Sequence, residues 1–247
     1  MRILLAITTY NELEITKRCI ESAIKSNINI DILLLDDYSQ KECIKELANL
    51  YNVFYIGKIK HYGLTHSWNL AYKFFIENHY DLLFISNNDL LIPSQTLSIL
   101  SDELLKSDKL VVIPSSTVTG AGIGKCGIAQ GITSIPNIDI NNSDNYQNVQ
   151  NYLSGQKLEL RETDFFNGFF FGLSRNIKVM EITDGVLFDK KRVNICNEID
   201  LYTRIRKLYP NHNKILHVKN AFIYHYKAVT INIKKRDDLK KLEKKYS

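Results

Sequence analysis

The stretch FISNNDLLIP, residues 84–93, holds the side chains with the clearest potential for chemistry. Its apolar run stops at two amides and a carboxylate, which are Asn87, Asn88 and Asp89. A turn would explain these residues, because Asn and Asp make local hydrogen bonds and tolerate unusual backbone angles. A cation site would explain them equally well, because hard divalent cations bind carboxylate and amide oxygens. The rest of the chain has to decide between the two.

Two other apolar runs also end on polar residues. Residues 8–11, Thr-Thr-Tyr-Asn, close the first run, and residues 36–39, Asp-Asp-Tyr-Ser, close the second. Ligands of open parallel sheets bind at the carboxyl ends of the strands. Three polar strand ends at one edge are more than turns require, so the pattern predicts a ligand site there, with Asp36 supporting its turn.

The elements that would position these residues alternate between strand and helix. Short apolar runs predict strands, and apolar residues three and four apart predict helices, with Asn11 and Ser39 as candidate helix caps. Strands are expected at 2–9, 30–37, 53–57, 81–86, 110–114 and 214–225, and helices at 11–27, 39–51, 65–79, 94–107 and 197–209. This alternation is typical of an α/β fold, with a mostly parallel sheet covered by helices on both faces.

Residues 117–152 interrupt the alternation with Gly, Asn, Ser and Ile. A stretch of this length without a periodic pattern predicts a flexible loop. We therefore divide the chain into residues 1–116, the loop 117–152, residues 153–226 and a tail of residues 227–247.

Composition narrows the class of protein. The 247 residues are 45% hydrophobic and 24% charged, as in a globular domain, and no apolar run approaches the roughly 20 residues that span a bilayer. The first residues are interpreted as a strand, not a signal peptide. The four cysteines form no CxxC pair, so we expect a reducing, cytoplasmic setting, with Cys19 and Cys43 on apolar helix faces.

The net charge of +5 lies mostly in the tail, where residues 233–247 carry +4. A nearly neutral body argues against nucleic acid as a partner. In a tail helix, Leu239, Leu242 and Tyr246 would share one side among lysines, as in helices that lie peripherally on anionic membranes. A solvated terminal helix explains the same pattern.

The ordered set TTYNE, LLLDDYS, GLTHSWNLA, ISNND, FNGFFFGLSR, NICNEIDLYTRI and FIYH resembles the family 2 glycosyltransferases. These are inverting enzymes of the GT-A fold that use nucleotide-sugars, and the resemblance covers roughly residues 2–226. It implies a single glycosyltransferase domain over 1–226, with a nucleotide-sugar-binding half (1–116) and an acceptor and catalytic half (153–226).

The resemblance implies a divalent cation, Mn²⁺ or Mg²⁺, that neutralises the diphosphate leaving group. The family's D-x-D-like motif falls on residues 87–89, so Asp89 matches the metal carboxylate and Asn87 replaces the first acid. His225 matches a family histidine at the metal or diphosphate.

Other positions match the family's nucleotide site, and Gly168 is expected to permit a close backbone approach. Asp37 could accept a hydrogen bond from the imide N–H of uracil or thymine, which favours a UDP- or dTDP-linked sugar. The predicted nucleotide-binding residues are Thr8, Tyr10, Asp37, Asn69 and Asn88.

The catalytic base is expected at the family's Glu-Asp pair, which is Asn197-Glu198 here. Glu198 is the first candidate and Asp200 its rival, and Asn197 is a candidate cap. The acceptor implied is a hydroxyl of a glycan or lipid-linked glycan in polysaccharide biosynthesis. Two alternatives stay open: an inactive nucleotide-sugar-binding scaffold, and a sugar-1-phosphate nucleotidyltransferase, which TTYNELE disfavours because it lacks a Gly-rich loop.

Overall fold

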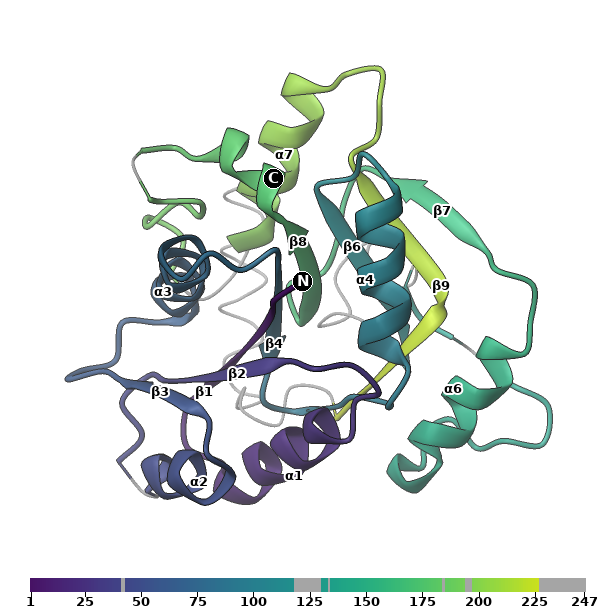
Figure 1. Cartoon of the computed structure of the whole chain (residues 1–247), viewed down its shortest axis with the longest axis horizontal. Helices are drawn as coiled ribbons and strands as arrows, with labels where there is room; N and C mark the ends of the chain where they lie inside the picture. Colours follow the sequence, from purple (N-terminus) through teal and green to yellow (C-terminus); the bar gives the residue numbers. More distant parts are fainter. Residues whose placement is uncertain (41–42, 118–129, 133, 184, 194–196, 227–247) are drawn as a thin grey trace, which may run out of the picture.

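The computed structural model describes residues 1–40, 43–117, 130–132, 134–183, 185–193 and 197–226. Within these residues, nine strands form one mixed sheet in the order β3-β2-β1-β4-β8-β6-β9-β5, and β7 pairs with β9 (Figure 1). The predicted tail helix and part of the predicted loop lie outside the described residues.

The first half of the chain alternates strand and helix as the apolar patterns predict. Its elements are β1 (Ile3–Thr9), α1 (Leu13–Ile24), β2 (Asp31–Asp36), α2 (Ile44–Tyr51), β3 (Phe54–Gly57), α3 (Leu64–Glu77), β4 (Leu82–Asn87), β5 (Leu90–Leu91), α4 (Thr96–Lys106) and β6 (Val111–Ser116).

The second half returns to the same sheet from the other direction. Its elements are η1 (Ser143–Asn145), α6 (Tyr146–Ser154), β7 (Leu160–Thr163), β8 (Phe170–Ser174), η2 (Arg175–Met180), α7 (Asn197–Leu208) and β9 (Ile215–His225). Strand β8 lies antiparallel between β4 and β6, which makes the sheet mixed.

The register of the parallel strands brings the polar strand ends together. Strand β1 is parallel to both β2 and β4, with Thr9 opposite Asp36 and Thr8 opposite Asn87. The expectation that the three strand ends share one edge of the sheet is therefore confirmed.

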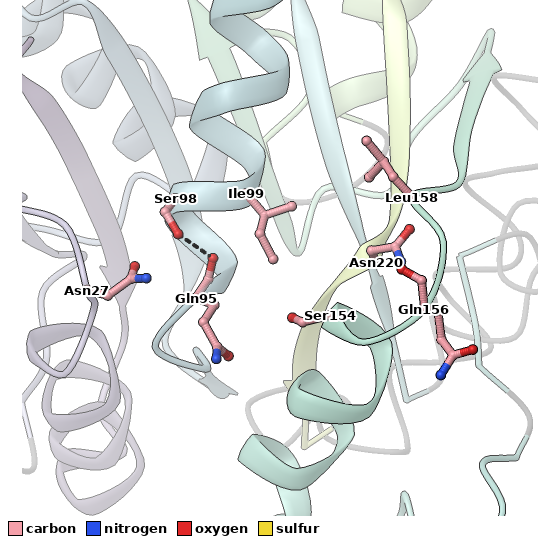
Figure 2. Close-up of a pocket in the computed structure, with 8 residues that line it drawn as sticks. All are labelled: Asn27, Gln95, Ser98, Ile99, Ser154, Gln156, Leu158 and Asn220. Carbon is pink, nitrogen blue, oxygen red and sulfur yellow. Dashed lines mark hydrogen bonds between the residues drawn. The ribbon is translucent and has the colours of Figure 1, made fainter.

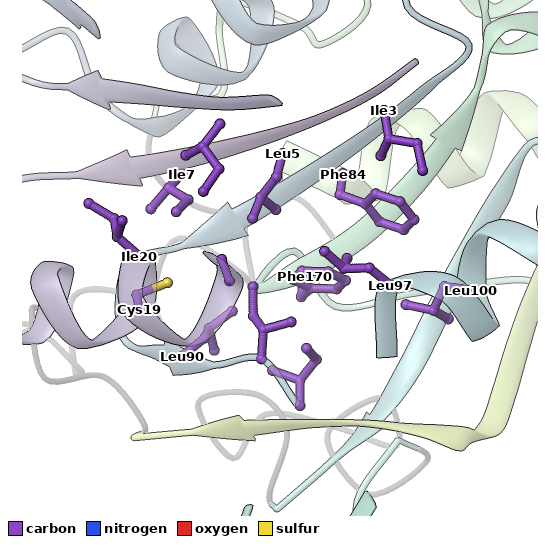
Figure 3. Close-up of a cluster of buried hydrophobic side chains, with 14 of the residues drawn as sticks. Ile3, Leu5, Ile7, Cys19, Ile20, Phe84, Leu90, Leu97, Leu100 and Phe170 are labelled. Atoms are coloured by element: carbon purple, nitrogen blue, oxygen red, sulfur yellow. The ribbon is translucent and has the colours of Figure 1, made fainter. Parts of the chain in front are cut away.

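Helices cover both faces of the sheet because the buried strands are apolar on both sides. One cluster joins β1 to α1, α2 and α4, and includes Leu5, Cys19, Leu97 and Phe170 (Figure 3). The opposite cluster joins the sheet to α3, η2 and α7 and includes Trp68. The edge that carries the polar strand ends is thus held between two apolar layers.

Two predicted helix caps differ from the structure. Helix α1 begins after Glu12, which has a left-handed backbone, and the Asn11 carboxamide instead accepts a hydrogen bond from Gln40 N. Helix α2 begins only at Ile44, and Ser39 donates to Asp36. The Ser39 hydroxyl also accepts from Asn11 N, so both side chains link the ends of β1 and β2. These contacts replace the local capping that the sequence suggests.

Two further local predictions are wrong. Residues 143–152 of the predicted loop form η1 and most of α6, and Cys43 is exposed at the start of α2 rather than packed on an apolar face. Helix α6 has no clear apolar stripe in the sequence, because side-chain amides dominate it. Gln150 holds α6 against β9 by donating to Asn220 O and accepting from Phe222 N. In the described residues, no helix is long and apolar enough to cross a membrane.

Candidate functional site

Asp89 and His225 meet at the edge of the sheet although they are far apart in sequence. Leu90 in β5 pairs antiparallel with His225 at the end of β9, so Asp89 is carried against the histidine ring. Asp89 Oδ2 lies 3.4 Å from His225 Nε2, and the two side chains are 3% and 11% exposed. Backbone bonds between His225 and Thr117 Oγ1 hold the histidine in place.

This pair fits a divalent cation. Asp89 Oδ1 and His225 Nδ1 are buried without a hydrogen-bond partner in the part of the chain that the structure describes, which is costly for polar groups. Carboxylate oxygen is a preferred ligand of Mg²⁺ and Mn²⁺, and neutral imidazole is the commonest nitrogen ligand of metal ions in proteins. Two ligands about 2.0–2.3 Å from one ion lie about 3 Å apart at right angles, close to the separation here. Among the described residues, no three acidic, His or Cys side chains are grouped closely enough to hold a metal ion.

The tripeptide 167–169 adjoins this pair. Phe169 stacks on His225 with ring centroids 5.0 Å apart, and its carbonyl accepts the Asn87 N–H at 2.9 Å. A Cβ atom on Gly168 would lie 2.5 Å from the Trp68 ring and 3.1 Å from Glu198 Oε2. The close approach expected at Gly168 is therefore confirmed, and it places the Glu198 carboxylate against the same tripeptide.

The two candidate bases have different surroundings. Glu198 lies in the first turn of α7, beside Gly168. Asp200 accepts a 2.9 Å hydrogen bond from Arg204 Nε, and Arg204 also donates to the carbonyls of Met180 and Leu187. Asp200 therefore helps to anchor α7 to the segment that precedes it. Asn197 is the first residue of α7, and its buried Oδ1 has no partner among the described residues.

The Asp37 carboxylate forms the centre of a second polar cluster. It accepts from Lys58 Nζ at 2.8 Å, Tyr62 N at 2.9 Å and Gly63 N at 2.8 Å, and pairs with His61 Nδ1 at 2.9 Å. A carboxylate has about four acceptor positions, so these contacts occupy all of them. The loop between β3 and α3 is thereby fixed to the end of β2.

Lys58 is the buried cation of this cluster, with a side chain only 2% exposed. Burial lowers the pKa of Lys58, and the nearby Asp37 charge opposes that shift. His61 is 45% exposed by contrast, and its ring lies 4.7 Å from the Tyr10 ring. Tyr10 is itself 43% exposed, so these two rings offer an aromatic surface at the ends of β1 and β3.

The other predicted nucleotide-binding side chains contact the protein. Thr8 Oγ1 donates to Ser86 O, and Asn88 Nδ2 donates to Thr9 and Thr16 hydroxyls. Asn69 uses both ends of its carboxamide on the backbone of Leu187 and Phe188. Their roles as nucleotide contacts remain predictions, and in this structure they join elements around the site.

A separate cavity of about 320 Å³ lies between α1, α4, α6 and β9 (Figure 2). It is lined by Asn27, Gln95, Ser98, Ile99, Ser154, Gln156, Leu158 and Asn220. None of these residues belongs to the predicted site. The Asn220 carboxamide also serves the fold, because it accepts from Glu159 N and donates to Leu153 O.

Sequence reasoning missed Lys58, His61 and Phe169 as parts of the site. It also missed Gln130, whose Oε1 accepts a hydrogen bond from Asn167 N in the neighbouring tripeptide. Lys58 lies in KIKH, which is typical of a solvated loop, and Phe169 lies in FFNGFFFGL, an aromatic run that is also typical of a buried strand. Gln130 lies within the predicted loop, residues 117–152, and has no local pattern. The available signal was the adjacent Gly168, where the sequence predicts a close backbone approach.

Comparisons with known proteins agree with this architecture. The model of a family described as glycosyl transferase family 2 matches residues 5–178. No curated protein matches the sequence. Among solved structures, GalNAc-T7 with UDP, GalNAc and Mn²⁺ is similar at a TM-score of 0.65 and 17% identity, covering 91% of this chain and 44% of the other.

Two more solved structures share the fold. TarS residues 1–349 of S. aureus gives a TM-score of 0.59 at 13% identity, covering 91% of this chain and 60% of the other. Mannosyltransferase PcManGT from Pyrobaculum calidifontis, in complex with GDP-Man and Mn²⁺, gives a TM-score of 0.58 at 13% identity. The match covers 91% of this chain and 56% of the other. The chain thus spans about half the length of these proteins, and the likeness establishes the GT-A-like fold.

Proposed function

The chain belongs to glycosyltransferase family 2, and we propose that it moves a sugar from a nucleotide-sugar to a hydroxyl of a glycan acceptor with inversion. The cation-ligand pair at the sheet edge and the carboxylate of α7 would serve this single reaction. The proposal extends to a role in polysaccharide biosynthesis at the membrane surface, where the enzyme would be peripherally bound. The acceptor would be a glycan or a lipid-linked glycan.

One observation carries the proposal. The tripeptide 167–169 contacts the predicted base through Gly168 and stacks on His225 through Phe169. Glu198 and the Asp89–His225 pair therefore border one short segment of chain. Inverting transfer needs a base on the acceptor side and charge neutralisation on the leaving-group side, and this arrangement supplies candidates for both.

The proposed chemistry follows from these positions. The acceptor oxygen attacks the anomeric carbon while the bond from that carbon to the diphosphate oxygen breaks. Glu198 takes the proton of the attacking hydroxyl, and the electron pair of the broken bond leaves on the nucleoside diphosphate. Attack opposite the leaving group inverts the configuration at the anomeric carbon. Gly168 leaves the Glu198 carboxylate accessible from the tripeptide side, because a larger side chain would press against it.

Asp89 and His225 are the residues that would hold a divalent cation, with Asn87 nearby at the end of β4. Mn²⁺ or Mg²⁺ bound there would neutralise charge on the leaving diphosphate. The buried Asp89 Oδ1, which has no hydrogen-bond partner among the described residues, supports this assignment, because such an atom is otherwise unfavourable.

The proposed donor is a nucleotide-sugar whose base is uracil or thymine. Because Asp37 already has four partners, an imide N–H would reach it by replacing one of them. Of these partners, His61 is the exposed side chain, so its displacement would open Asp37 to the base. Tyr10, beside His61, would then lie against the base plane.

The test is donor turnover by the full chain. UDP-, dTDP- and GDP-linked sugars are incubated with Mn²⁺ or with EDTA, and nucleoside diphosphate release is measured with and without glycan acceptors. We expect release from UDP- or dTDP-sugars with Mn²⁺, and NMR should show the inverted anomer in the product. Tight donor binding without any release would favour the scaffold alternative, and a retained anomer would contradict inversion.

A further inference from the structure

Gln130 contacts the same tripeptide at its first residue, Asn167. Its side chain is 1% exposed, and its Oε1 accepts hydrogen bonds from Asn167 N at 3.0 Å and from Asn167 Nδ2 at 3.1 Å. Its Nε2 donates to Pro114 O in β6 at 3.1 Å. One buried carboxamide thus connects β6 to the residue before Gly168.

The backbone of Gln130 is fixed as well. Ser116 N donates to Gln130 O at 2.8 Å, and Ile132 N donates to Ser116 O at 2.8 Å. The carboxamide therefore projects from a segment that is tied to the end of β6. Because the backbone of Gln130 is fixed, its side chain has little freedom to move and can hold its hydrogen-bond partners in place.

The position of residues 167–169 affects both halves of the proposed site. Gly168 contacts Trp68 and Glu198, whereas Phe169 stacks on His225 and bonds to Asn87 N. A shift of this tripeptide would change the distance between the base and the cation ligands. Displacements of about 1 Å in such an arrangement can cost about 10²-fold in rate.

We propose that Gln130 is a positioning residue that clamps residues 167–169, and so sets the geometry between Glu198 and the Asp89–His225 pair. The inference rests on the proposed function for its kinetic consequence. The hold of Gln130 on residues 167–169 can be tested without an activity assay, because Trp68 reports on it. Gln130 acts through Asn167, which makes both hydrogen bonds to its Oε1.

Trp68 reports on the clamp directly. It is the single tryptophan of the chain, is 1% exposed, and touches the space that a Gly168 side chain would fill. Loosening of residues 167–169 would admit solvent and quencher to its ring. Acrylamide quenching of tryptophan fluorescence therefore measures the clamp whether or not a substrate is known.

The experiment compares two volume-preserving variants of the full chain. Gln130→Met removes the three hydrogen bonds of the clamp. Gln150→Met is the matched control, because Gln150 is also fully buried and bonds to Phe222 N and Asn220 O between α6 and β9. Asn167→Ala is a milder second variant that removes one of the two bonds to Gln130.

We expect Gln130→Met to raise the quenching constant of Trp68 at least twofold, with Asn167→Ala in between and Gln150→Met at the wild-type value. With an active donor, kcat should fall about 10- to 100-fold in Gln130→Met. Donor KM should change less than threefold, because Tyr10 and Asp37 lie in the other polar cluster.

Three results would overturn the clamp. Wild-type quenching in folded Gln130→Met and Asn167→Ala would show that Trp68 does not depend on it. Equal changes in Gln150→Met would show general loosening, not a local effect. Altered quenching with unchanged kcat would remove the positioning role. If wild-type protein turns over no donor, the proposed function fails while the quenching result still decides whether Gln130 holds residues 167–169.

Discussion

At the scale of the residue, the two carboxylates of α7 make a direct test of the base. Glu198→Gln keeps the size of the side chain beside Gly168 but removes its proton affinity, so transfer should fall roughly 10²–10⁴-fold. Donor binding, measured by calorimetry, should stay near the wild-type value, because the substitution leaves the Asp37 cluster intact.

Asp200→Asn is the comparison for that experiment. Its carboxylate bonds to Arg204, so we expect a modest loss of stability and a rate within a few-fold of wild type. Near-normal transfer by Glu198→Gln, combined with strong loss in Asp200→Asn, would assign the base to Asp200.

The cation site gives a second residue-scale prediction. Asp89→Asn removes the charge and keeps the shape, so Mn²⁺ should no longer strengthen UDP binding. Calorimetry with UDP, with and without Mn²⁺, measures this difference. The control is Asp108→Asn, an exposed carboxylate paired with Lys214 at the surface, which should leave the metal dependence unchanged. Full metal dependence in Asp89→Asn would contradict its role as a ligand.

At the scale of the element, β9 carries a buried titratable group. His217 is 4% exposed and lies 3.0 Å from Ser115 Oγ, and burial lowers its pKa to about 4, with Lys219 and Arg161 adding to the shift. Unfolded histidine titrates near 6.5, so between pH 6.5 and 4 the unfolded chain binds the extra proton. Stability should therefore be intact above about pH 6.5 and fall with decreasing pH through this window.

The size of this effect can be measured by urea unfolding. Going from pH 7.5 to pH 5 should cost the wild type about 2 kcal/mol through His217 alone. His217→Gln keeps a polar group near Ser115 but cannot gain a proton, so its pH dependence should be smaller by about that amount. Identical pH dependence of the two proteins would mean that His217 is already free to ionise in the folded state.

At the scale of the whole molecule, ligand binding should stabilise the fold by mass action. A nucleoside diphosphate at about 100 times its Kd adds about 2.7 kcal/mol. For a chain of this size that corresponds to a rise in Tm of about 5–10 °C. Differential scanning fluorimetry of the full chain with UDP and Mn²⁺ measures this rise.

Comparing the Tm shifts caused by different ligands distinguishes the cation site from the site of the nucleotide base. UDP with Mn²⁺ should raise Tm more than UDP with EDTA, and Mn²⁺ alone should give a smaller shift. An equal rise with and without the metal would place the diphosphate away from Asp89 and His225. CDP serves as the control nucleotide, because cytosine N3 carries no hydrogen and cannot donate to Asp37.

The sequence by itself determined the alternation of strands and helices and the shared edge of polar strand ends. Both follow from local information, because an apolar run or a helical stripe is encoded within a few residues. The strand ends at Thr8, Asp36 and Asn87 could be assigned to one edge from the strand pattern alone, since parallel strands align their carboxyl ends. The helix caps at Asn11 and Ser39 were predicted wrongly, because each side chain has a partner distant in sequence: Asn11 Oδ1 accepts from Gln40 N, and Ser39 Oγ accepts from Asn11 N.

Only the tertiary structure decided which side chains meet. Asp89 reaches His225 through the antiparallel pairing of β5 with β9, and Asn167 reaches Gln130 because β8 lies between β4 and β6. The partners of Asp37 come from a loop that follows another strand. Such contacts depend on the order and register of strands that are distant in sequence. Hydrophobic periodicity is a local pattern, so it cannot predict them.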